Sequence, residues 1–301
     1  MIRPIKPYVW CLRPKYPYET SKTWEDFLCL RPVMPVLCSF DRVAPQTEIT
    51  LNFPRPFVAR PRLPHGIRHL DMDKNNRILV KTEIPFFTKD WANCRFIAWE
   101  DAKLYRGIGD VFALAPCDLD FLTGEHMRYL WRDHNAPASV RIKFERPFAT
   151  PPKVVIFFNR IEFERNRNWR AVTTATDIDA KGFTLNIETW SDTILHCAQT
   201  CWIAYPEDRK HIFSTSVSTM EVRPWNQPQH QANMEILFNS IEFVKTPSVF
   251  IALNYLDMDC NANLRINAYV DGITTTRLTW HIDTFGDTVL HAAGASIIAF
   301  T

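Results

Sequence analysis

One segment of the chain recurs along its length at a spacing of about 90 residues. Residues 148–161 match residues 243–256 without a gap, and an arginine follows each run nine residues later, at Arg170 and Arg265. A pentapeptide that begins and ends with threonine starts 19 residues after each of these arginines. A repeat of this length constrains the domain organisation before any strand is assigned.

A third, more diverged copy lies at the front of the chain. The tetrapeptide Leu-Asp-Met-Asp occurs at 70–73 and again at 256–259, and Arg77 takes the place of the two later arginines. The three arginines, at 77, 170 and 265, stand 93 and 95 residues apart. The sequence therefore predicts three tandem domains after an N-terminal extension: the extension covers residues 1–27, and the domains cover 28–115, 116–206 and 207–301.

The hydrophobic pattern within a copy is that of β-strands. Residues 183–188 alternate between apolar and polar, as in a strand with one buried face, and 154–158 are a continuous apolar run typical of a strand covered on both sides. No stretch shows a sustained helical period with caps. The sequence predicts an all-β protein of three tandem antiparallel β-sandwiches with about six strands each. Two arrangements stay open, an intramolecular pseudo-trimer of the copies and an assembly of several chains.

Composition excludes several classes of function. The net charge is only +2, from 35 basic and 33 acidic residues, so we expect no nucleic-acid partner. With 8 glycines against 21 prolines, a glycine-rich phosphate-binding loop is not expected either. No apolar run has the length of a membrane span or a secretory signal, so we expect no membrane insertion and a cytoplasmic location. Secretion by an unconventional route is the alternative.

The chain has 8 cysteines, and without a secretory signal we expect free thiols. Cys197 and Cys201, beside His196, suggest a metal site at first sight. On a strand, however, positions four apart are separated by roughly 13 Å. We interpret the two cysteines as core thiols, and we expect neither a metal nor another cofactor.

At its repeated motifs the chain resembles the H-type lectin family. The second copy shows the whole pattern: Pro-Pro-Lys-Val at 151–154, Asn-Trp-Arg at 168–170, Gly-Phe at 182–183, Thr-Trp-Ser-Asp-Thr at 189–193 and Trp-Ile at 202–203. The resemblance covers roughly residues 30 to 301. It implies six-stranded sandwiches that trimerise and bind galactose or N-acetylgalactosamine (GalNAc) near the interfaces, without enzymatic activity.

The resemblance also implies the site residues. Each copy would use the arginine, the aromatic residue of the pentapeptide with the residue after it, and an acidic residue ahead of the first phenylalanine. The third copy departs from this pattern at the stacking and acidic positions. An arginine facing a carboxylate can bind two neighbouring sugar hydroxyls, an indole packs on the apolar face of the ring, and several weak sites on one chain raise avidity. The expected residues are Asp41, Arg77, Trp99 and Glu100 in the first copy, Asp133, Arg170, Trp190 and Ser191 in the second, and Asn226, Arg265, Phe285 and Gly286 in the third.

Other interpretations of the same residues remain open. The arginines could instead be salt-bridged to a neighbouring copy, at Glu162 or Asp257. The sandwiches could also form a structural or adhesion module that binds protein partners, with degenerate sugar pockets. A glycoside hydrolase needs two carboxylates about 5 to 9.5 Å apart. The paired aspartates of the repeated tetrapeptide are missing from the second copy, so we expect no enzyme.

Overall fold

Three antiparallel sheets of six strands each build the protein. The structure is a computed structural model that describes residues 36–43, 48–131, 135–239, 241 and 243–301. The predicted N-terminal extension lies outside these residues. In spatial order, sheet I contains β2 (Glu48–Asn52), β5 (Trp91–Ala98), β4 (Ile78–Phe87), β9 (Lys153–Phe163), β12 (Leu195–Tyr205) and β7 (Leu122–Tyr129). Sheet II contains β13 (Ile212–Ser218), β18 (Leu290–Phe300), β15 (Ser248–Met258), β10 (Trp169–Asp179), β11 (Gly182–Glu188) and β8 (Ser139–Lys143). Sheet III contains β1 (Val36–Val43), β6 (Leu104–Ala113), β3 (His65–Met72), β16 (Leu264–Asp271), β17 (Arg277–Asp283) and β14 (Asn233–Leu237).

The helical content of the described residues is one short 3-10 turn, η2 (Thr219–Glu221). Ser218 caps this turn, since its side chain accepts a hydrogen bond from the backbone of Met220 while Glu221 bonds back to the backbone of Ser218. Within the described ranges, no helix has the length and apolar character needed to cross a membrane. The prediction of an all-β fold is confirmed.

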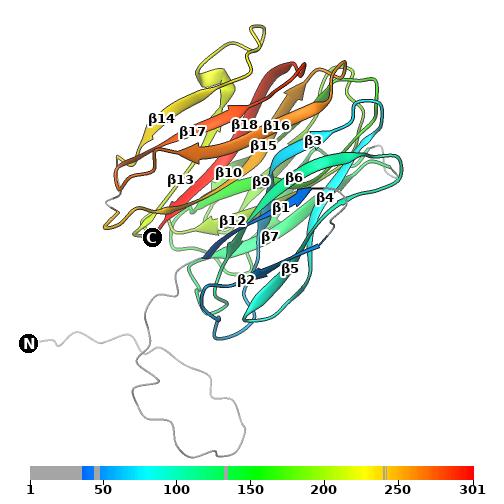
Figure 1. Cartoon of the computed structure of the whole chain (residues 1–301). Helices are drawn as coiled ribbons and strands as arrows, with labels where there is room; N and C mark the ends of the chain where they lie inside the picture. Colours follow the sequence, from blue (N-terminus) through cyan, green and yellow to red (C-terminus); the bar gives the residue numbers. More distant parts are fainter. Residues whose placement is uncertain (1–35, 44–47, 132–134, 240, 242) are drawn as a thin grey trace, which may run out of the picture. The chain divides into compact units, whose positions relative to one another are not determined.

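Each sheet joins strands from two of the three predicted copies. The junctions are β4 with β9 in sheet I, β10 with β15 in sheet II and β3 with β16 in sheet III, and we call them seams I, II and III. In Figure 1 the cyan strand β3 lies beside the orange strand β16, although the two are far apart in the sequence. Each copy gives three strands to one sheet and three to the next, so every sheet crosses a predicted domain boundary.

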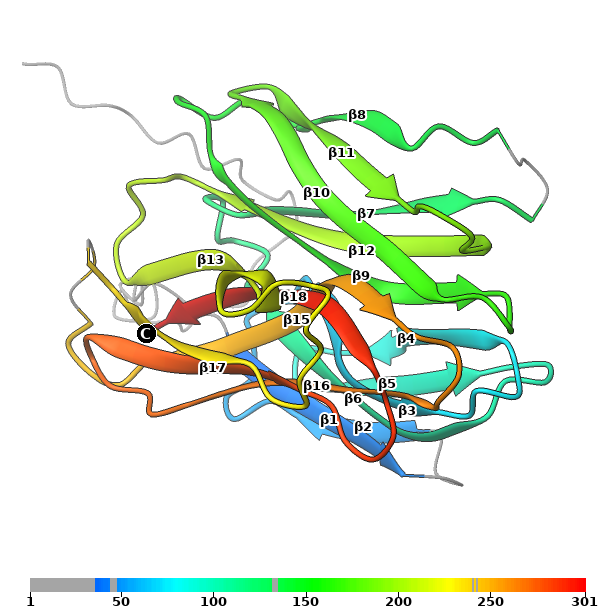
Figure 2. The same cartoon turned by 90° about the horizontal axis from the view of Figure 1, so that it is seen from above.

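The sandwich predicted for each copy lies between two of these sheets. In the middle third, β10 packs over β9 and β12, as Figure 2 shows from above. Strand β9 is buried almost throughout, as the continuous apolar run predicts. Phe183, Leu185 and Ile187 on β11 are buried, in agreement with the predicted alternation. The hydrophobic pattern therefore identified the core faces of both layers.

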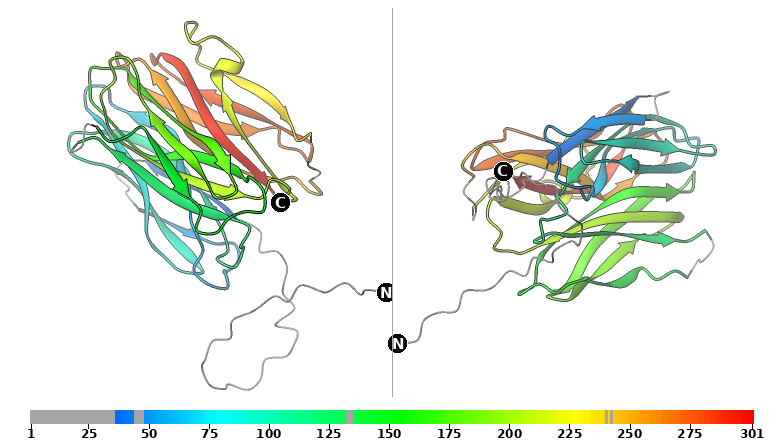
Figure 3. Two further views of the ribbon diagram at one scale, coloured as in Figure 1. Left: turned by 180° about the vertical axis from the view of Figure 1, so that it is seen from behind. Right: turned by 90° about the horizontal axis from the view of Figure 1, so that it is seen from below.

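The three copies meet at a centre where equivalent positions hold different side chains. Gly66 on β3, Phe157 on β9 and Ala252 on β15 occupy matching places, as their partners on the adjacent strands show. A Cβ added at Gly66 would lie 2.5 Å from the Ala252 Cβ and 2.6 Å from a ring carbon of Phe157. Phe157 therefore fills the space that the glycine leaves open. Figure 3 shows the arrangement of the sheets from behind and from below.

Polar contacts connect the copies in a cycle around this centre. Strands β6, β12 and β18 each turn one polar side chain toward the backbone of another copy. In each case the contacted residue directly precedes Gly66, Phe157 or Ala252 in the sequence. Asp110 accepts a hydrogen bond from the Ile251 N–H (3.4 Å), Ser296 donates to the Ile156 carbonyl (2.7 Å), and the backbone of His65 bonds to the Cys201 thiol.

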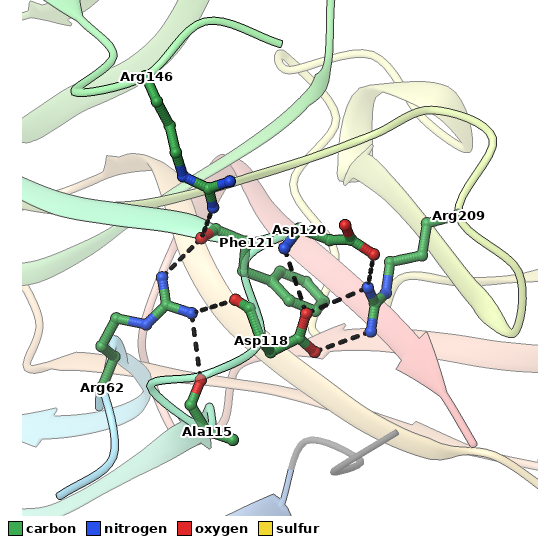
Figure 4. Close-up of polar contacts among 7 residues, drawn as sticks. All are labelled: Arg62, Ala115, Asp118, Asp120, Phe121, Arg146 and Arg209. Carbon is green, nitrogen blue, oxygen red and sulfur yellow. Dashed lines mark hydrogen bonds and ion pairs between the residues drawn. The ribbon is translucent and has the colours of Figure 1, made fainter. Parts of the chain in front are cut away.

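The linkers between the copies converge on one polar cluster, drawn in Figure 4. Arg62 donates to the carbonyls of Phe121 (2.6 Å) and Asp118 (2.7 Å) in the first linker. Arg209, in the second linker, pairs with the Asp118 carboxylate at 2.8 Å. The cluster is completed by Arg62 to the Ala115 carbonyl, Arg146 to the Phe121 carbonyl and Arg209 to Asp120. The two linkers are thereby tied to each other and to the loop before β3.

The six cysteines in the described part of the chain are free thiols, as predicted; they are Cys38, Cys94, Cys117, Cys197, Cys201 and Cys260. Cys11 and Cys29 lie outside that part. Burial raises the pKa of Cys197 to about 12 and that of Cys201 well above its ordinary value. Both are buried side chains of β12 that remain protonated thiols at neutral pH.

Candidate functional site

The repeated arginines lie at the seams between copies. In seam II, Arg170 on β10 is directly opposite Asp257 on β15, and its Nε lies 3.1 Å from Asp257 Oδ1. Its Nη1 donates to Asp192 Oδ1 at 2.5 Å. The guanidinium is thus held between a carboxylate of its own copy and one of the next copy. The alternative interpretation of a salt bridge to Asp257 is correct for this arginine.

The two threonines of the pentapeptide fix its loop to strand β10. Thr189 Oγ1 donates to the Arg170 carbonyl (2.7 Å), and Thr193 Oγ1 donates to the Asn168 carbonyl (2.5 Å). Between them Ser191 has φ 58°, a left-handed conformation that turns the loop back over the strand. The two threonines and the turn at Ser191 therefore place the side chain of Trp190 over the seam.

A pocket of about 350 Å³ lies at seam II. Trp190 forms one wall, and its indole lies 5.7 Å from the ring of Tyr255, between centroids. Trp225 forms another, 56% exposed and 6.3 Å from the His291 ring. Trp190 belongs to the second copy and Trp225 to the third. The full lining is Arg170, Trp190 and Ser191 from the second copy and Met220, Trp225, Tyr255, Asp257 and His291 from the third.

The charges in this pocket are shaped by burial. Burial raises the pKa of Asp257 above its ordinary value of 3.8, although Arg170 opposes the shift. The hydrogen bond from Arg170 lowers the pKa of the exposed Asp192. Burial also raises the pKa of Tyr255 to about 12, so its hydroxyl stays protonated. The pocket thus combines an oriented guanidinium, one partly desolvated carboxyl group and three aromatic faces.

Seam III has the same polar frame with a different lining. Arg265 Nε lies 3.5 Å from Asp71 Oδ1, and its Nη1 lies 2.6 Å from Asp287 Oδ1. In place of the Trp190 and Tyr255 pair, the ring of Phe285 stacks on His69 with centroids 6.3 Å apart. Burial lowers the pKa of His69 to about 4, so the imidazole is neutral at pH 7. The equivalent of Trp225 falls on residues that the structure does not describe.

Seam I is dominated by ion pairs. Arg77 donates to Glu100 (2.6 Å) and Asp101 (2.9 Å), both in its own copy. Glu162, which corresponds to Asp257, pairs with Arg160 instead, so the alternative of a bridge from Arg77 to Glu162 is wrong. The Arg160 guanidinium lies over the Trp99 ring, 5.1 Å from the ring centroid. One face of Trp99 is therefore already in contact with a cation.

The structure brings together nine of the predicted site residues in three groups, one at each seam. The placement of two others corrects their assignment. Asp41 lies on β1 in sheet III, where it pairs with Arg106, and not beside Arg77 in sheet I. Asn226 is exposed and follows Trp225 of the seam II pocket, so it does not join Arg265. Asp133 lies outside the described residues. The strands of one copy enter two different sheets, so Asp41 and Asn226 lie near a different seam from the arginine of their own copy.

Apart from Asp257, the sequence missed the side chains that the following copy contributes to the pocket at seam II. Tyr255, Trp225 and His291 line seam II but come from the third copy. One signal was available, because the repeated tetrapeptide places Asp71 six residues before Arg77 and Asp257 eight residues before Arg265. The aromatic side chains gave no such signal, since Tyr255 corresponds to Arg160 and His69 in the other copies.

Comparison with known proteins agrees with the repeated motifs. No curated protein matches the chain. Among solved structures, recombinant discoidin II of Dictyostelium discoideum matches with 13% sequence identity and a TM-score of 0.26, over 60% of this chain and 96% of that one. Residues 139–205 and 233–300 each match the family model of the H-type lectin domain. Two segments of the chain, one on each side of seam II, are therefore similar to this lectin domain.

Proposed function

We propose that the protein is a lectin that binds glycans of the galactose or GalNAc type at seam II. The observation that carries the proposal is the pocket in which Arg170 and Asp257 meet between Trp190, Tyr255 and Trp225. Both segments that flank it match the H-type lectin domain. The match supports carbohydrate binding in general, and the geometry of the pocket supports this sugar type.

The chemistry of the pocket suits a sugar with neighbouring hydroxyls. Arg170 is held at Nε and Nη1 by two carboxylates, so its orientation is set before a ligand arrives. A hydroxyl can donate to Asp257 while its neighbour accepts from the guanidinium. Leaving such groups unpaired penalises the wrong epimer. The indoles of Trp190 and Trp225 offer faces on which the apolar side of the ring can pack.

The proposal includes the arrangement of the copies as an intramolecular pseudo-trimer. The strand exchange among three sheets supports it, as does the cycle of contacts made by Asp110, Cys201 and Ser296 around the centre. All three seams are already paired within one chain. We therefore expect a monomer of 35.2 kDa in sedimentation, and a species of three chains would refute this part of the proposal.

The function is binding without chemical conversion of the sugar. Asp257 is engaged by Arg170, which leaves it a hydrogen-bonding group in place of a general acid. A glycoside hydrolase needs a second carboxyl group across the scissile bond, and the other acidic side chain that contacts Arg170, Asp192, is hydrogen-bonded to it. Hydrolysis of a chromogenic galactoside by the purified protein would contradict this conclusion.

The decisive experiment is calorimetric titration with GalNAc, supported by a glycan array. Wild-type protein should bind, and Arg170→Ala should lose binding because it removes the oriented donor. Arg141→Ala is the matched control, since Arg141 forms an exposed ion pair with Asp179 on the edge of sheet II. Binding that survives in Arg170→Ala would refute the site.

A second candidate is a module that binds protein partners. Seams I and III favour it, because Arg160 lies over Trp99 and His69 stacks on Phe285, so at these two seams one face of the aromatic ring already contacts a neighbouring side chain. A partner captured equally well with and without free GalNAc, by a protein that fails on the glycan array, would support this candidate over the lectin.

A further inference from the structure

Three equivalent polar clusters surround the centre of the protein, and one differs from the others. Each cluster joins a residue of β6, β12 or β18 to its neighbour on an edge strand and to the bulge residue of β3, β9 or β15. The clusters are Asp110, Ser39 and Arg68 in the first copy, Cys201, Glu125 and Asn159 in the second, and Ser296, Ser216 and Asn254 in the third.

The first and third clusters are complete. In the first, Asp110 is neutralised by Arg68 (3.0 Å) and accepts a hydrogen bond from Ser39 (2.7 Å). In the third, the Asn254 amide donates to both Ser216 (2.7 Å) and Ser296 (2.9 Å). Every group has a partner of complementary character, so neither cluster calls for a ligand.

The second cluster is rich in acceptors and lacks the cation of the first. Glu125 Oε1 lies 3.3 Å from the Cys201 sulfur, and the Asn159 amide nitrogen lies 3.2 Å from the same sulfur. Among the described residues no lysine or arginine forms a salt bridge with Glu125. Asn159 is only 2% exposed, and its side-chain oxygen Oδ1 is buried without a hydrogen-bond partner. Such an atom carries a cost unless a ligand satisfies it.

A histidine faces this cluster in place of an isoleucine. His65 occupies the position that Ile156 and Ile251 hold beside the other two clusters. Donor atoms of His65, Glu125 and Cys201 all lie within 4.8 Å of one another. The ring nitrogen Nδ1 of His65 lies 2.9 Å from the Leu63 carbonyl. Its Nε2 lies 3.3 Å from the Thr82 carbonyl. With the proton on Nδ1, the shorter of these two hydrogen bonds is kept and Nε2 carries the lone pair, as is usual for a ligating histidine.

We propose that His65, Glu125 and Cys201 bind one zinc ion. Mixed sulfur, nitrogen and oxygen donors favour zinc over calcium or magnesium. Tetrahedral zinc with ordinary bond lengths separates a sulfur and an oxygen ligand by roughly 3.5 Å, close to the 3.3 Å between Cys201 and Glu125. The Asn159 amide nitrogen faces Cys201 and Glu125, so a half-turn of this amide would bring its unpartnered oxygen to the fourth position. Binding releases the thiol proton of Cys201 to solvent and forms the zinc–sulfur bond.

The surroundings provide support and access for the ion. Gln199 donates to the other carboxylate oxygen of Glu125 at 2.6 Å, which orients the ligand. His65, Glu125 and Cys201 line a pocket of about 350 Å³, and Glu125 is exposed at its mouth. The pocket lies between the first and second copies, so the ion would join β3 to β7 and β12. It shares no residue with the pocket at seam II.

Titration of the full chain with Zn²⁺, after removal of metals with a chelator, tests the proposal. Wild type should bind one zinc ion per chain, with no comparable binding of Ca²⁺ or Mg²⁺. Glu125→Gln changes an exposed side chain without changing its size and should weaken zinc binding by about 100-fold. Cys197→Ser is the matched control, because Cys197 is a buried thiol on the same strand that lies outside the cluster. A wild-type protein that does not saturate at one zinc ion would overturn the proposal.

Cobalt provides a second readout that does not depend on affinity. Co²⁺ bound to wild type and to Cys197→Ser should show a thiolate-to-cobalt charge-transfer band and the visible bands of a tetrahedral site. Cys201→Ser should lack the charge-transfer band, with circular dichroism used to verify its fold. If Cys201→Ser does not fold, Glu125→Gln still decides, since zinc should raise the melting temperature of wild type more than that of this variant. Equal effects on both would refute the site.

Discussion

Seams II and III have the same frame and different linings. In both, an arginine is held between two aspartates, and two threonines bond the loop to the strand with nearly equal distances, 2.7 and 2.5 Å in seam II and 2.6 and 2.7 Å in seam III. Above this frame, seam II presents Trp190 and Tyr255, whereas seam III presents Phe285 and the buried His69. The frame therefore belongs to the architecture of the sheet, and the lining decides what a seam can bind.

The largest expected difference between the seams is in stability. Arg170→Ala leaves the buried Asp257 without its cation and should lower the free energy of unfolding by about 3 kcal/mol. Arg265→Ala should cost only about 1 kcal/mol, because the Asp71 side chain is 22% exposed and its pair is longer, at 3.5 Å. Urea unfolding of both variants measures the difference. Equal costs would show that the two frames are not distinguished by burial.

The next effect concerns sugar affinity. Trp190→Ala removes the stacking face of seam II and should weaken GalNAc binding by about 2 kcal/mol, roughly 30-fold. Phe285→Ala should leave the affinity unchanged, since Phe285 already packs on His69. Calorimetry on the two variants provides the comparison. A loss in Phe285→Ala as large as in Trp190→Ala would place sugar at seam III.

A gain of function tests whether the lining alone separates the seams. The triple variant His69→Tyr, Phe285→Trp and Gly286→Ser copies three lining residues of seam II onto seam III. Gly286 has φ 68°, so the serine should cost about 1 kcal/mol of strain, and Ser191 shows that the loop accepts serine. The number of GalNAc molecules bound per chain should rise by one. An unchanged stoichiometry would mean that the wall opposite, Trp225 in seam II, is also required.

The smallest effect is a dependence on pH. Burial raises the pKa of Asp257 above 3.8, so acidification protonates it at a higher pH than an exposed aspartate. A protonated Asp257 no longer holds Arg170, so GalNAc affinity should fall as the pH is lowered toward that pKa. Affinity measured across the acid range, with Asp257→Asn for comparison, tests this. The variant should bind weakly with a flat profile, and a wild-type profile as flat would contradict the role of Asp257.

The sequence was sufficient for the fold class and for half of each site. Equal spacing of Arg170 and Arg265 before their threonine loops predicted which side chains meet within a copy, because a strand and the loop fixed to it are local. Asp257 as the partner of Arg170 was one of the interpretations left open, but the other partners across the seams could not be predicted, since nothing in the spacing says which copy supplies the neighbouring strand. Asp41 and Asn226 were assigned to their own copies for that reason, and Trp225 was missed.

The difference among Gly66, Phe157 and Ala252 has a consequence for how such a protein can be put together. Three separate but identical chains would have to place the same residue at all three central positions. Three phenylalanines would collide there, as the 2.6 Å approach at Gly66 indicates, and three glycines would leave a void. A single chain escapes this rule, because each copy has a fixed rank in the order. The copies are consequently not interchangeable. If the first and second copies exchanged places along the chain, each copy would meet a different neighbour at each of its two seams.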